Sequence, residues 1–516
     1  MKIEQLIIKG FKRFRDFTIQ FNDRLTIIVG ENEVGKSTVL EALDIILNKR
    51  IFNKEDISLV KYFNNDNVRA FFESGLAIDL PKIEIDIDFD CDDEIVGLNF
   101  SGIVERDNDK QEKCGIHFEF CLDEEFIDDV DFSKCAENYV VPIEYYRATW
   151  STYSGKSYRT QMLPLKTMFL DNSQVKNNLY GSYARKIYID KISENTRREI
   201  SGQFNIMLAR FKHTYEDELL IQDSRMIGLD VNKTDLNKLV DIYEDDISVQ
   251  DMGKGKENIV KTEIALSGNT FDVICIEEPE SHLSHSNTRK LIEFINESTN
   301  EQLILTSHSS MIASRLNIKN IVWLSATSAY SLKAISQQTA SYFEKIDNLD
   351  ILKFILSKRV ILVEGAAEYI LLPTIFKKLF EETLDESGIE VISMGSISYA
   401  NYQEISEQLV DKKVVVITDN DGRADKTSIE SNFAIFSDSD IKNWTLEVAF
   451  YNLNTDFFDS EYKDRRTKAE YNKQECPKAL AHMLKNKTEN ALVIEKVCKD
   501  LVVPKYIEDA LKWIKE

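Results

Sequence analysis

Residues 25–37 read LTIIVGENEVGKS, an apolar run followed by a loop that contains two glycines. Residues 30–37 of this stretch fit the pattern G-x-x-x-x-G-K-[ST], and the apolar spacing of the residues that follow is typical of a helix. The glycines let successive backbone N–H groups turn inward around phosphate oxygens, while Lys36 supplies a positive charge and Ser37 a hydroxyl for Mg²⁺. A strand, a phosphate-binding loop and a helix in this order predict an α/β nucleotide-binding domain.

The composition limits the class of protein. The chain has 516 residues, 43% of them hydrophobic, which is enough for about three domains with buried cores. The formal net charge of −24 argues against a general nucleic-acid coat, so contact with DNA or RNA is expected to be local. No apolar run approaches the roughly 18 residues of a membrane span, which predicts a cytoplasmic protein with no membrane contact.

The cysteines are scattered and include no C-x-x-C pair. We therefore expect reduced thiols of a cytosolic protein and not zinc ligands. They are Cys91, Cys114, Cys121, Cys135, Cys275, Cys476 and Cys498.

The order of the apolar segments predicts two α/β domains. A hairpin is expected in residues 2–21, and half-exposed antiparallel strands at 82–90 and 116–122. A polar, basic, helical stretch interrupts the first domain, which resumes with buried strands at 271–276 and 303–307. Three further apolar strands begin at 360, 389 and 413 and predict a separate parallel sheet.

The expected boundaries follow from these changes of pattern. The second domain begins near 345–358. The expected parts are a nucleotide-binding part at 1–164, a helical insertion at 165–245, a second nucleotide-binding part at 246–350 and a C-terminal domain at 351–516.

Two acids end the strand in ICIEEPESHL, residues 274–283. Glu277 is placed to hold Mg²⁺, commonly through water, and Glu278 to orient or deprotonate an attacking water. His308 follows the next strand and is expected near the γ-phosphate, although a lone histidine is more often structural. The alternative for the two acids is a strand end capped by exposed carboxylates.

MGKGKENI, residues 252–259, precedes this strand and combines glycines and lysines with a following helix. Such a segment presents N–H groups to phosphate, typically that of a partner subunit, but a flexible basic loop is an alternative. The residues assigned to nucleotide binding are Gly30, Asn32, Gly35, Lys36, Ser37, Thr38, Gly253, Gly255 and Glu277.

These motifs, with the opening KGFKRFRDF, resemble the ATP-binding-cassette ATPases of the RecF, SMC and Rad50 type. The resemblance implies ATP-dependent association of two head domains, each completing the other's site, with the helical region at 165–245 as a place where subunits meet. The first acid of the EEPE segment, Glu277, departs from the commoner aspartate, and EEPE is the form associated with the OLD (overcoming lysogenization defect) family.

Four acids follow strand ends in the C-terminal domain. Glu364 and Glu368 lie one helical turn apart in VEGAAEYI, and Asp419 and Asp421 form a D-x-D after the strand at 413–417. Carboxyl ends of parallel strands share one edge of a sheet, so we expect these acids to converge there. Clustered carboxylates repel one another unless cations compensate, which predicts Mg²⁺ or Mn²⁺. A solvated turn at 364–368 is the alternative on local evidence.

E-G-x-x-E followed by D-x-D resembles a Toprim domain. With the ATPase on the same chain, the resemblance to OLD family nucleases, including the Gabija and retron-associated ones, covers essentially the whole length. It implies an α/β fold in which an ABC-type ATPase with a helical insertion precedes a Rossmann-like Toprim domain. It also implies that Glu447 is a further metal ligand and that Lys487 lies near the scissile phosphate. Gly395 fits a turn that approaches the site.

The resulting hypothesis is an ATP-regulated endonuclease that cleaves DNA with two metal ions, in defence against phage or other mobile DNA. Metal ligands would be Glu364, Glu368, Asp419, Asp421 and Glu447, with Lys487 stabilising charge, and Ser37 would hold the magnesium of ATP. A solvated basic face at Lys463, Arg465, Arg466 and Lys468 offers counter-charge for the nucleic-acid backbone. A defence-system protein or retron RNA/DNA is a further expected partner.

Three alternatives stay open at this level. The chain could be an SMC-like ATPase sensor whose Toprim module is a docking surface, or the metal site could cut RNA such as tRNA. A topoisomerase would need a tyrosine nucleophile near the metals, and 20 tyrosines are present.

Overall fold

The computed structural model describes residues 1–516 except for 50–56, 92–93, 107–108, 164, 173–179, 216–219, 223–224, 227–235, 237–238, 269–270, 300–301, 346–349 and 396–397. The chain divides into two compact units. Unit 1 is Met1–Ile312 with Leu324–Ala329, and unit 2 is Ala313–Trp323 with Tyr330–Glu516. The expected boundary near 345–358, part of which lies outside the described residues, is later than this division.

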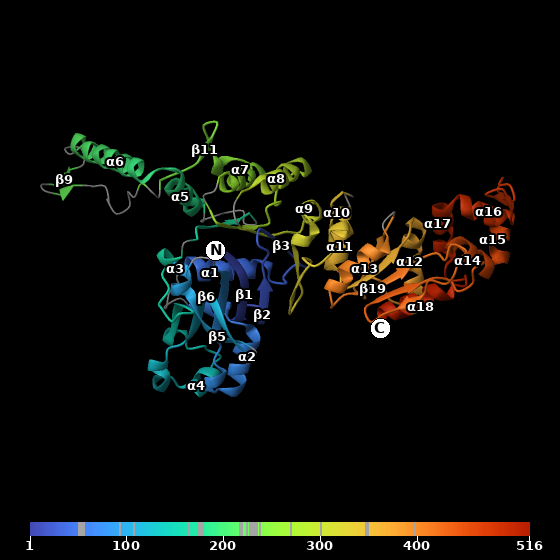
Figure 1. The fold of residues 1–516 in the computed structure, drawn as a ribbon, viewed down its shortest axis with the longest axis horizontal. Coiled ribbons are helices and arrows are strands. Elements are labelled where there is room, and N and C mark those ends of the chain that lie inside the picture. Colours follow the sequence, from blue (N-terminus) through green and yellow to red (C-terminus); the bar gives the residue numbers. More distant parts are fainter. Residues whose placement is uncertain are drawn as a thin grey trace. The chain divides into compact units, whose positions relative to one another are not determined.

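An antiparallel sheet forms one layer of unit 1, with strand order β2-β1-β4-β6-β5 and β7 paired with β6. Figure 1 draws several of these strands side by side in blue. Their apolar side chains alternate with polar ones, and the apolar set is buried, as in Ile83, Ile85 and Ile87 of β4. The bounds are β1 Lys2–Phe11, β2 Phe14–Gln20, β4 Ile83–Asp90, β5 Ser101–Arg106, β6 Asp109–Leu122 and β7 Tyr146–Thr152.

A parallel sheet carries the nucleotide motifs in unit 1, in the order β3-β14-β13-β8. The strands β3 (Leu25–Val29), β13 (Val273–Glu277) and β14 (Gln302–Thr306) were expected from their apolar runs. β8 (Thr167–Asp171) was not: these residues were assigned to the helical insertion, yet they pair with β13 over five positions. Burial of Met168 and Leu170 explains the strand, and the sheet therefore extends past residue 164.

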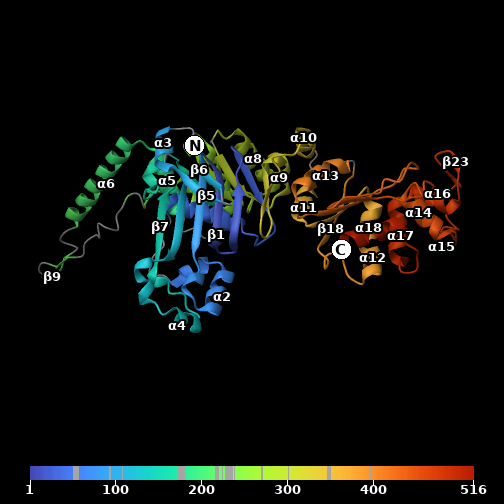
Figure 2. The ribbon, with the colours of Figure 1, turned by 60° about the horizontal axis from the view of Figure 1, so that its bottom comes forward.

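Helices complete unit 1. α1 (Lys36–Asn48) follows the phosphate loop, α7 (Lys254–Leu266) precedes β13, and α8 (His285–Glu297) and α9 (Ser310–Arg315) follow β13 and β14. The helical region contains α5 (Tyr180–Lys191) and α6 (Glu194–Thr214), drawn in green in Figures 1 and 2. Much of the expected insertion beyond α6, including 227–235, lies outside the described residues.

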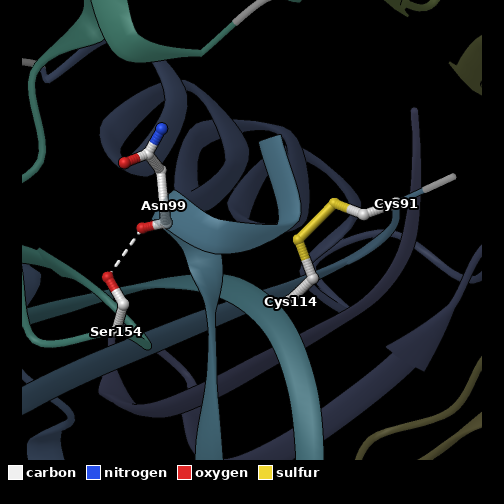
Figure 3. Close-up of a disulfide and its surroundings, with 4 residues drawn as sticks. All are labelled: Cys91, Asn99, Cys114 and Ser154. Carbon is white, nitrogen blue, oxygen red and sulfur yellow. Dashed lines mark hydrogen bonds between the residues drawn. A yellow bond between two sulfur atoms is a disulfide. The ribbon is translucent and has the colours of Figure 1, made fainter. Parts of the chain in front are cut away.

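One disulfide corrects the expectation of reduced thiols. Cys91 and Cys114 are bonded, with their Cα atoms 6.5 Å apart (Figure 3). Cys114 lies opposite Phe89 in the pairing of β4 with β6, so the residue two positions after Phe89 passes close to it. This proximity comes from strand register, which a separation of 23 residues in sequence does not reveal. The free cysteines are Cys121, Cys135, Cys275, Cys476 and Cys498.

Unit 2 is built on a parallel sheet of order β18-β17-β19-β21, with β20 antiparallel at its edge. The three expected strands are β17 (Arg359–Val363), β18 (Ile389–Ser393) and β19 (Lys413–Ile417); β21 (Phe433–Phe436) was not expected. The antiparallel edge strand β20 comprises Ser428–Ile429. The four parallel strands are mostly buried, whereas β20 is exposed, and α18 (Lys505–Lys515) packs against β19.

The other helices of unit 2 surround this sheet. α12 and α17 pack side by side, as Figure 2 shows. Their bounds are α10 Gln337–Lys345, α11 Asp350–Leu356, α12 Ala366–Phe380, α13 Tyr399–Gln408, α14 Leu446–Leu453, α15 Thr455–Glu461, α16 Lys478–Lys485 and α17 Lys487–Val497. A hairpin of β22 (Glu470–Tyr471) and β23 (Gln474–Glu475) lies between α15 and α16 in the chain.

Close packing in the antiparallel sheet gives a stability prediction. A Cβ added at Gly115 would lie 2.3 Å from both the carbonyl oxygen of Ile87 and the ring of Tyr153. Gly115→Ala should therefore destabilise unit 1 by about 1–3 kcal/mol, seen as a lower midpoint of urea or thermal unfolding. Gly202→Ala on α6, where the added methyl meets nothing within 4 Å, should leave the midpoint unchanged or raise it. Equal midpoints for the two variants would contradict this packing.

Candidate functional site

The phosphate loop leaves β3 and enters α1 with its lysine turned inward. The Lys36 ammonium donates to the carbonyl oxygens of Gly30 at 3.0 Å and Glu31 at 2.8 Å. Gly35 has φ of 104°, a left-handed conformation that favours glycine. Burial lowers the pKa of Lys36, although the charges of nearby glutamates raise it. The ammonium is thus fixed at the start of α1, where phosphate binds.

The other predicted loop residues have different environments. Asn32 and Ser37 are exposed, whereas Thr38 is buried on α1. Ser37 hydrogen-bonds to Glu277, the last residue of β13. Burial raises the pKa of Glu277, this hydrogen bond lowers it, and the charges of Asp171 and Glu278 raise it further. A carboxylate and a hydroxyl therefore meet where a nucleotide-bound Mg²⁺ requires oxygen donors.

The structure brings Glu278 and His308 together. The His308 Nε2 atom lies 3.9 Å from a carboxylate oxygen of Glu278. Glu278 has a φ of 44°, an uncommon value for a residue other than glycine, and its N–H donates to the carbonyl oxygen of Thr306 at 3.1 Å. Burial and the charge of Lys36 lower the pKa of His308, which favours the neutral ring. Uncommon backbone conformations concentrate at functional sites.

Glu280, the third glutamate of the EEPE segment, was missed by the sequence interpretation. Its carboxylate accepts from the Ser307 hydroxyl and the His308 N–H, both at 2.8 Å. Its other oxygen is buried without a hydrogen-bond partner among the described residues, and burial raises the pKa of Glu280. Glu280 therefore holds the loop that carries His308.

The segment at 252–259 forms the start of α7, with Gly253 at the N-cap. A Cβ at Gly255 would lie 2.4 Å from the carbonyl oxygen of His282, whereas one at Gly253 would meet nothing within 4 Å. Asn258 also donates to the carbonyl oxygen of Ser281 at 3.0 Å. Gly255 is thus required by the packing of α7 on the turn after β13, and Gly253 is exposed.

In unit 2, Glu364 follows β17 and Asp419 follows the adjacent β19. The Glu364 carboxylate accepts from the Thr418 hydroxyl and from the Asp419 N–H, the latter at 3.3 Å. One Asp419 oxygen accepts from the Leu446 N–H at 3.0 Å. The parallel pairing of β17 with β19 places these two acids at one edge of the sheet.

Unbalanced negative charge marks the cluster. Burial raises the pKa of Asp419 to about 7, and the charges of Glu368 and Glu364 contribute. Burial also raises the pKa of Glu368, on the first turn of α12, with contributions from Glu447 and Glu364. Four carboxylates therefore lie close enough to oppose one another's ionisation.

Lys487 is the cation of this cluster. Its ammonium lies 3.2 Å from the buried Glu447 carboxylate, which also accepts from the Thr445 hydroxyl. Burial lowers the pKa of Lys487, but Glu447, Asp419 and Glu368 more than offset this, so the pKa is raised. Glu447 and Lys487 look like ordinary helix residues in the sequence, and the structure brings both to the acids.

Asp421 and Gly395 stand apart. The Asp421 carboxylate pairs with the Lys426 ammonium at 2.8 Å, and that ammonium also donates to the Asp419 carbonyl oxygen at 2.7 Å. Gly395 is exposed with φ of 55°.

Sequence reasoning also missed Tyr506. Burial and the charge of Asp419 raise the pKa of its hydroxyl. Lys426 and Tyr506 are distant in sequence from the E-G-x-x-E motif, and neither belongs to a motif that could have identified it.

The donor set fits a hard divalent cation. Carboxylate oxygens are what Mg²⁺ and Mn²⁺ prefer. Burial, with a smaller contribution from the neighbouring carboxylates, raises the pKa values of Asp419 and Glu368. Across the described ranges, no three Asp, Glu, His or Cys side chains are already arranged as a metal cage. Glu364 and Glu447 instead accept hydrogen bonds from Thr418 and Thr445.

Comparisons with known proteins identify both parts. Residues 1–267 match the family model of an AAA ATPase domain, and residues 254–314 match a second AAA domain model. Residues 355–421 match the model described as overcoming lysogenization defect protein-like, TOPRIM domain. The expected fold class, an α/β ATPase domain followed by a Toprim domain, is confirmed.

Individual relatives are similar over shorter stretches. The chromosome partition protein Smc of Halobacteriovorax marinus is 45% identical over 51 residues, 10% of this chain and 4% of that protein. The DNA replication and repair protein RecF of Acetivibrio thermocellus is 30% identical over 92 residues, 18% of this chain and 24% of that protein.

Solved structures include the Smc head bound to the C-winged helix domain of ScpA, which is 14% identical with a TM-score of 0.35. The match covers 64% of this chain and 99% of that one. The AAA ATPase model spans more than half of the 516 residues, and the Toprim match follows it in the chain. The chain therefore belongs to the AAA ATPase domain family and carries an OLD-like Toprim domain behind its ATPase domain.

Proposed function

We propose that the protein is an ATP-regulated, divalent-metal-dependent endonuclease that cleaves DNA in defence against phage or other mobile DNA. The observation that carries the proposal is the cluster of Glu364, Glu368, Asp419 and Glu447 with Lys487 at the carboxyl edge of the parallel sheet. The OLD-like Toprim match supports the nuclease class, and the ATPase match supports nucleotide control.

In unit 1, the residues divide the work of ATP hydrolysis. Lys36, fixed by two carbonyl oxygens, binds the phosphates, and Ser37 with Glu277 holds the magnesium of ATP. Glu278 would orient and deprotonate the attacking water, and His308, whose Nε2 lies 3.9 Å from the Glu278 carboxylate, would lie near the γ-phosphate. Asn32, Gly30, Gly35 and Thr38 complete the loop.

In unit 2, the acids would hold two Mg²⁺ or Mn²⁺ ions, which when bound supply a nucleophilic hydroxide and neutralise the leaving oxygen. Glu364 and Asp419 are positioned by Thr418 and by the Leu446 N–H. Lys487 places a positive charge beside Glu447, where it can stabilise charge that develops on the phosphate. Asp421 would join the ligands only if it left Lys426.

We further propose that the active form contains at least two copies. Helix α6 supports this because Ile200, Met207, Phe211 and Tyr215 follow one face of it and are 40–59% exposed. Such a stripe is stabilised when a second apolar surface covers it. The start of α7, with the exposed Gly253, would then complete the nucleotide site of the other copy.

The setting of the protein is also part of the proposal. In the part of the chain that the structure describes, no helix is long and apolar enough to cross a membrane. We place the protein in the cytoplasm and expect a defence-system protein or retron RNA/DNA as partner. The Cys91–Cys114 disulfide is uncommon in such a reducing compartment.

A second function is favoured by one observation. Asp421 pairs with Lys426, and the described residues contain no ready group of three metal ligands. This arrangement suits a Toprim module that serves as a docking surface in an ATPase sensor, or one that cuts RNA such as tRNA with a rearranged site.

The nucleotide site yields the first functional prediction. Lys36→Ala should abolish ATP binding because the loop loses its fixed cation, while Glu278→Gln should bind ATP but hydrolyse it at least about 10²-fold more slowly. Fluorescent-nucleotide binding and phosphate release measure the two effects. Unchanged turnover in Glu278→Gln would refute the assignment of the general base.

The acidic cluster yields the second functional prediction. Asp419→Ala and Glu364→Ala should weaken Mn²⁺ binding in calorimetry and abolish plasmid cleavage, with ATP hydrolysis retained. Lys487→Ala should keep metal binding but cut about 10²-fold more slowly, because it removes charge stabilisation and no ligand. Glu407→Ala, an exposed acid on α13, is the control. Full cleavage by Asp419→Ala, or none by the wild type with any metal or nucleic acid, would refute the nuclease.

Helix α6 yields the third functional prediction. Phe211→Asp should shift sedimentation towards the monomer and make ATP turnover dependent on protein concentration, because a buried charge opposes association. Asn205→Asp adds the same charge on the other side of the helix and should change neither. A wild-type chain that is monomeric at micromolar concentration would contradict the dimer.

A further inference from the structure

Two aromatic side chains lie beside the acidic cluster without a role in the chemistry above. The rings of Trp444 and Tyr471 stack with centroids 6.1 Å apart and planes inclined by 26°. Trp444 keeps 36% of its surface exposed, although a tryptophan this large is usually highly buried. The pair is therefore a partly exposed aromatic surface, in which the half-buried Tyr471 ring lies against the exposed Trp444 ring.

Trp444 is tied to the cluster through the backbone. It directly precedes Thr445, the N-cap of α14, and the next N–H along, that of Leu446, donates to Asp419 at 3.0 Å. A Cβ added at Gly422, just after the D-x-D segment, would lie 3.6 Å from the Cβ of Trp444. The ring is thus held between the D-x-D loop and the start of α14.

Tyr471 reaches the same place from a short hairpin. Tyr471 pairs with Gln474, and the turn residues Asn472 and Lys473 both have positive φ, as a tight two-residue hairpin turn requires. The hairpin packs against α16. Its short, fixed turn keeps the tyrosine ring in position against Trp444.

The charge around this pair differs from that of the rest of the chain. Residues 463–478 hold six basic and three acidic side chains in a protein with a net charge of −24. Arg466, Lys468 and Lys473 are exposed and form no ion pair with any described residue. Exposed aromatic rings next to unpaired cations are suited to nucleic acid, in which bases stack and phosphates carry charge.

We propose that Trp444 and Tyr471 form a stacking platform for an unpaired base of the substrate strand, next to the phosphate at the acidic cluster. The inference rests on the proposed nuclease function and narrows its substrate to nucleic acid with a single-stranded segment. A duplex hides its base faces in the helical stack, whereas a single strand offers them to aromatic rings. Arg466, Lys468 and Lys473 bind the adjoining phosphates.

Binding measurements on the full chain test this platform. Fluorescence anisotropy in Ca²⁺ would compare labelled single-stranded DNA, single-stranded RNA and blunt duplex DNA of one sequence. Wild type should bind a single strand more tightly than the duplex; Trp444→Ala and Tyr471→Ala should each lose about 10-fold for the single strand and little for the duplex. Tyr471→Phe should bind like wild type, since it keeps the ring. Leu453→Ala, which changes an exposed apolar residue at the end of α14, is the control.

The outcomes separate the two proposals. If Trp444→Ala lowers the affinity for single-stranded DNA and single-stranded RNA equally, the result supports base stacking without selection of the sugar. If it lowers the affinity for only one of the two, that nucleic acid is identified as the substrate. Wild type that binds single strands and duplex equally, with both alanine variants unchanged, overturns the platform and leaves the nuclease intact. Wild type that binds no nucleic acid at all overturns both. Circular dichroism and thermal unfolding of each variant check that unit 2, which carries both rings, is folded.

Discussion

Parallel pairing of buried strands is the constraint on which both sites depend. Register places Glu277 beside Asp171 and Thr306 in unit 1, and Val363 beside Ile417 in unit 2, so the residue after each strand emerges at the same edge. Apolar strands covered on both faces leave that edge as the place where polar groups can reach solvent. The acids are therefore close because of hydrogen bonds made far from them along the strands.

Each unit uses one lysine to hold together carboxylates that repel one another. Lys36 is surrounded by Glu277, Glu278 and Glu280, and Lys487 by Glu447, Asp419 and Glu368. The two differ in how they are fixed: Lys36 donates to carbonyl oxygens of its own loop, whereas Lys487 depends on a carboxylate from another helix. The first lysine is therefore held in place independently of the acids, and the second is held by them.

Sequence patterns predicted what is local and missed what depends on register. The phosphate loop, the strand ends at Glu277 and Asp419, and three strands of the second sheet all follow from apolar runs bounded by acids or glycine. β8 was missed because its alternation is short and lies in a polar stretch, and the Cys91–Cys114 bond because only the pairing of β4 with β6 brings the two together. Glu447 and Lys487 were predicted only from the family resemblance, because no local sequence pattern in their helices distinguishes them from other helical residues.

The left-handed backbone at Glu278 and Asp421, with φ of 44° and 56°, limits which replacements are informative there. Asparagine and aspartate adopt this conformation far more readily than alanine or β-branched residues do. Replacing Asp421 by asparagine would remove one charge and leave the chain path intact, whereas alanine would alter both. The same restriction applies to natural substitutions: at these two positions, the main-chain conformation limits which residue types are tolerated, independently of the chemistry of their side chains.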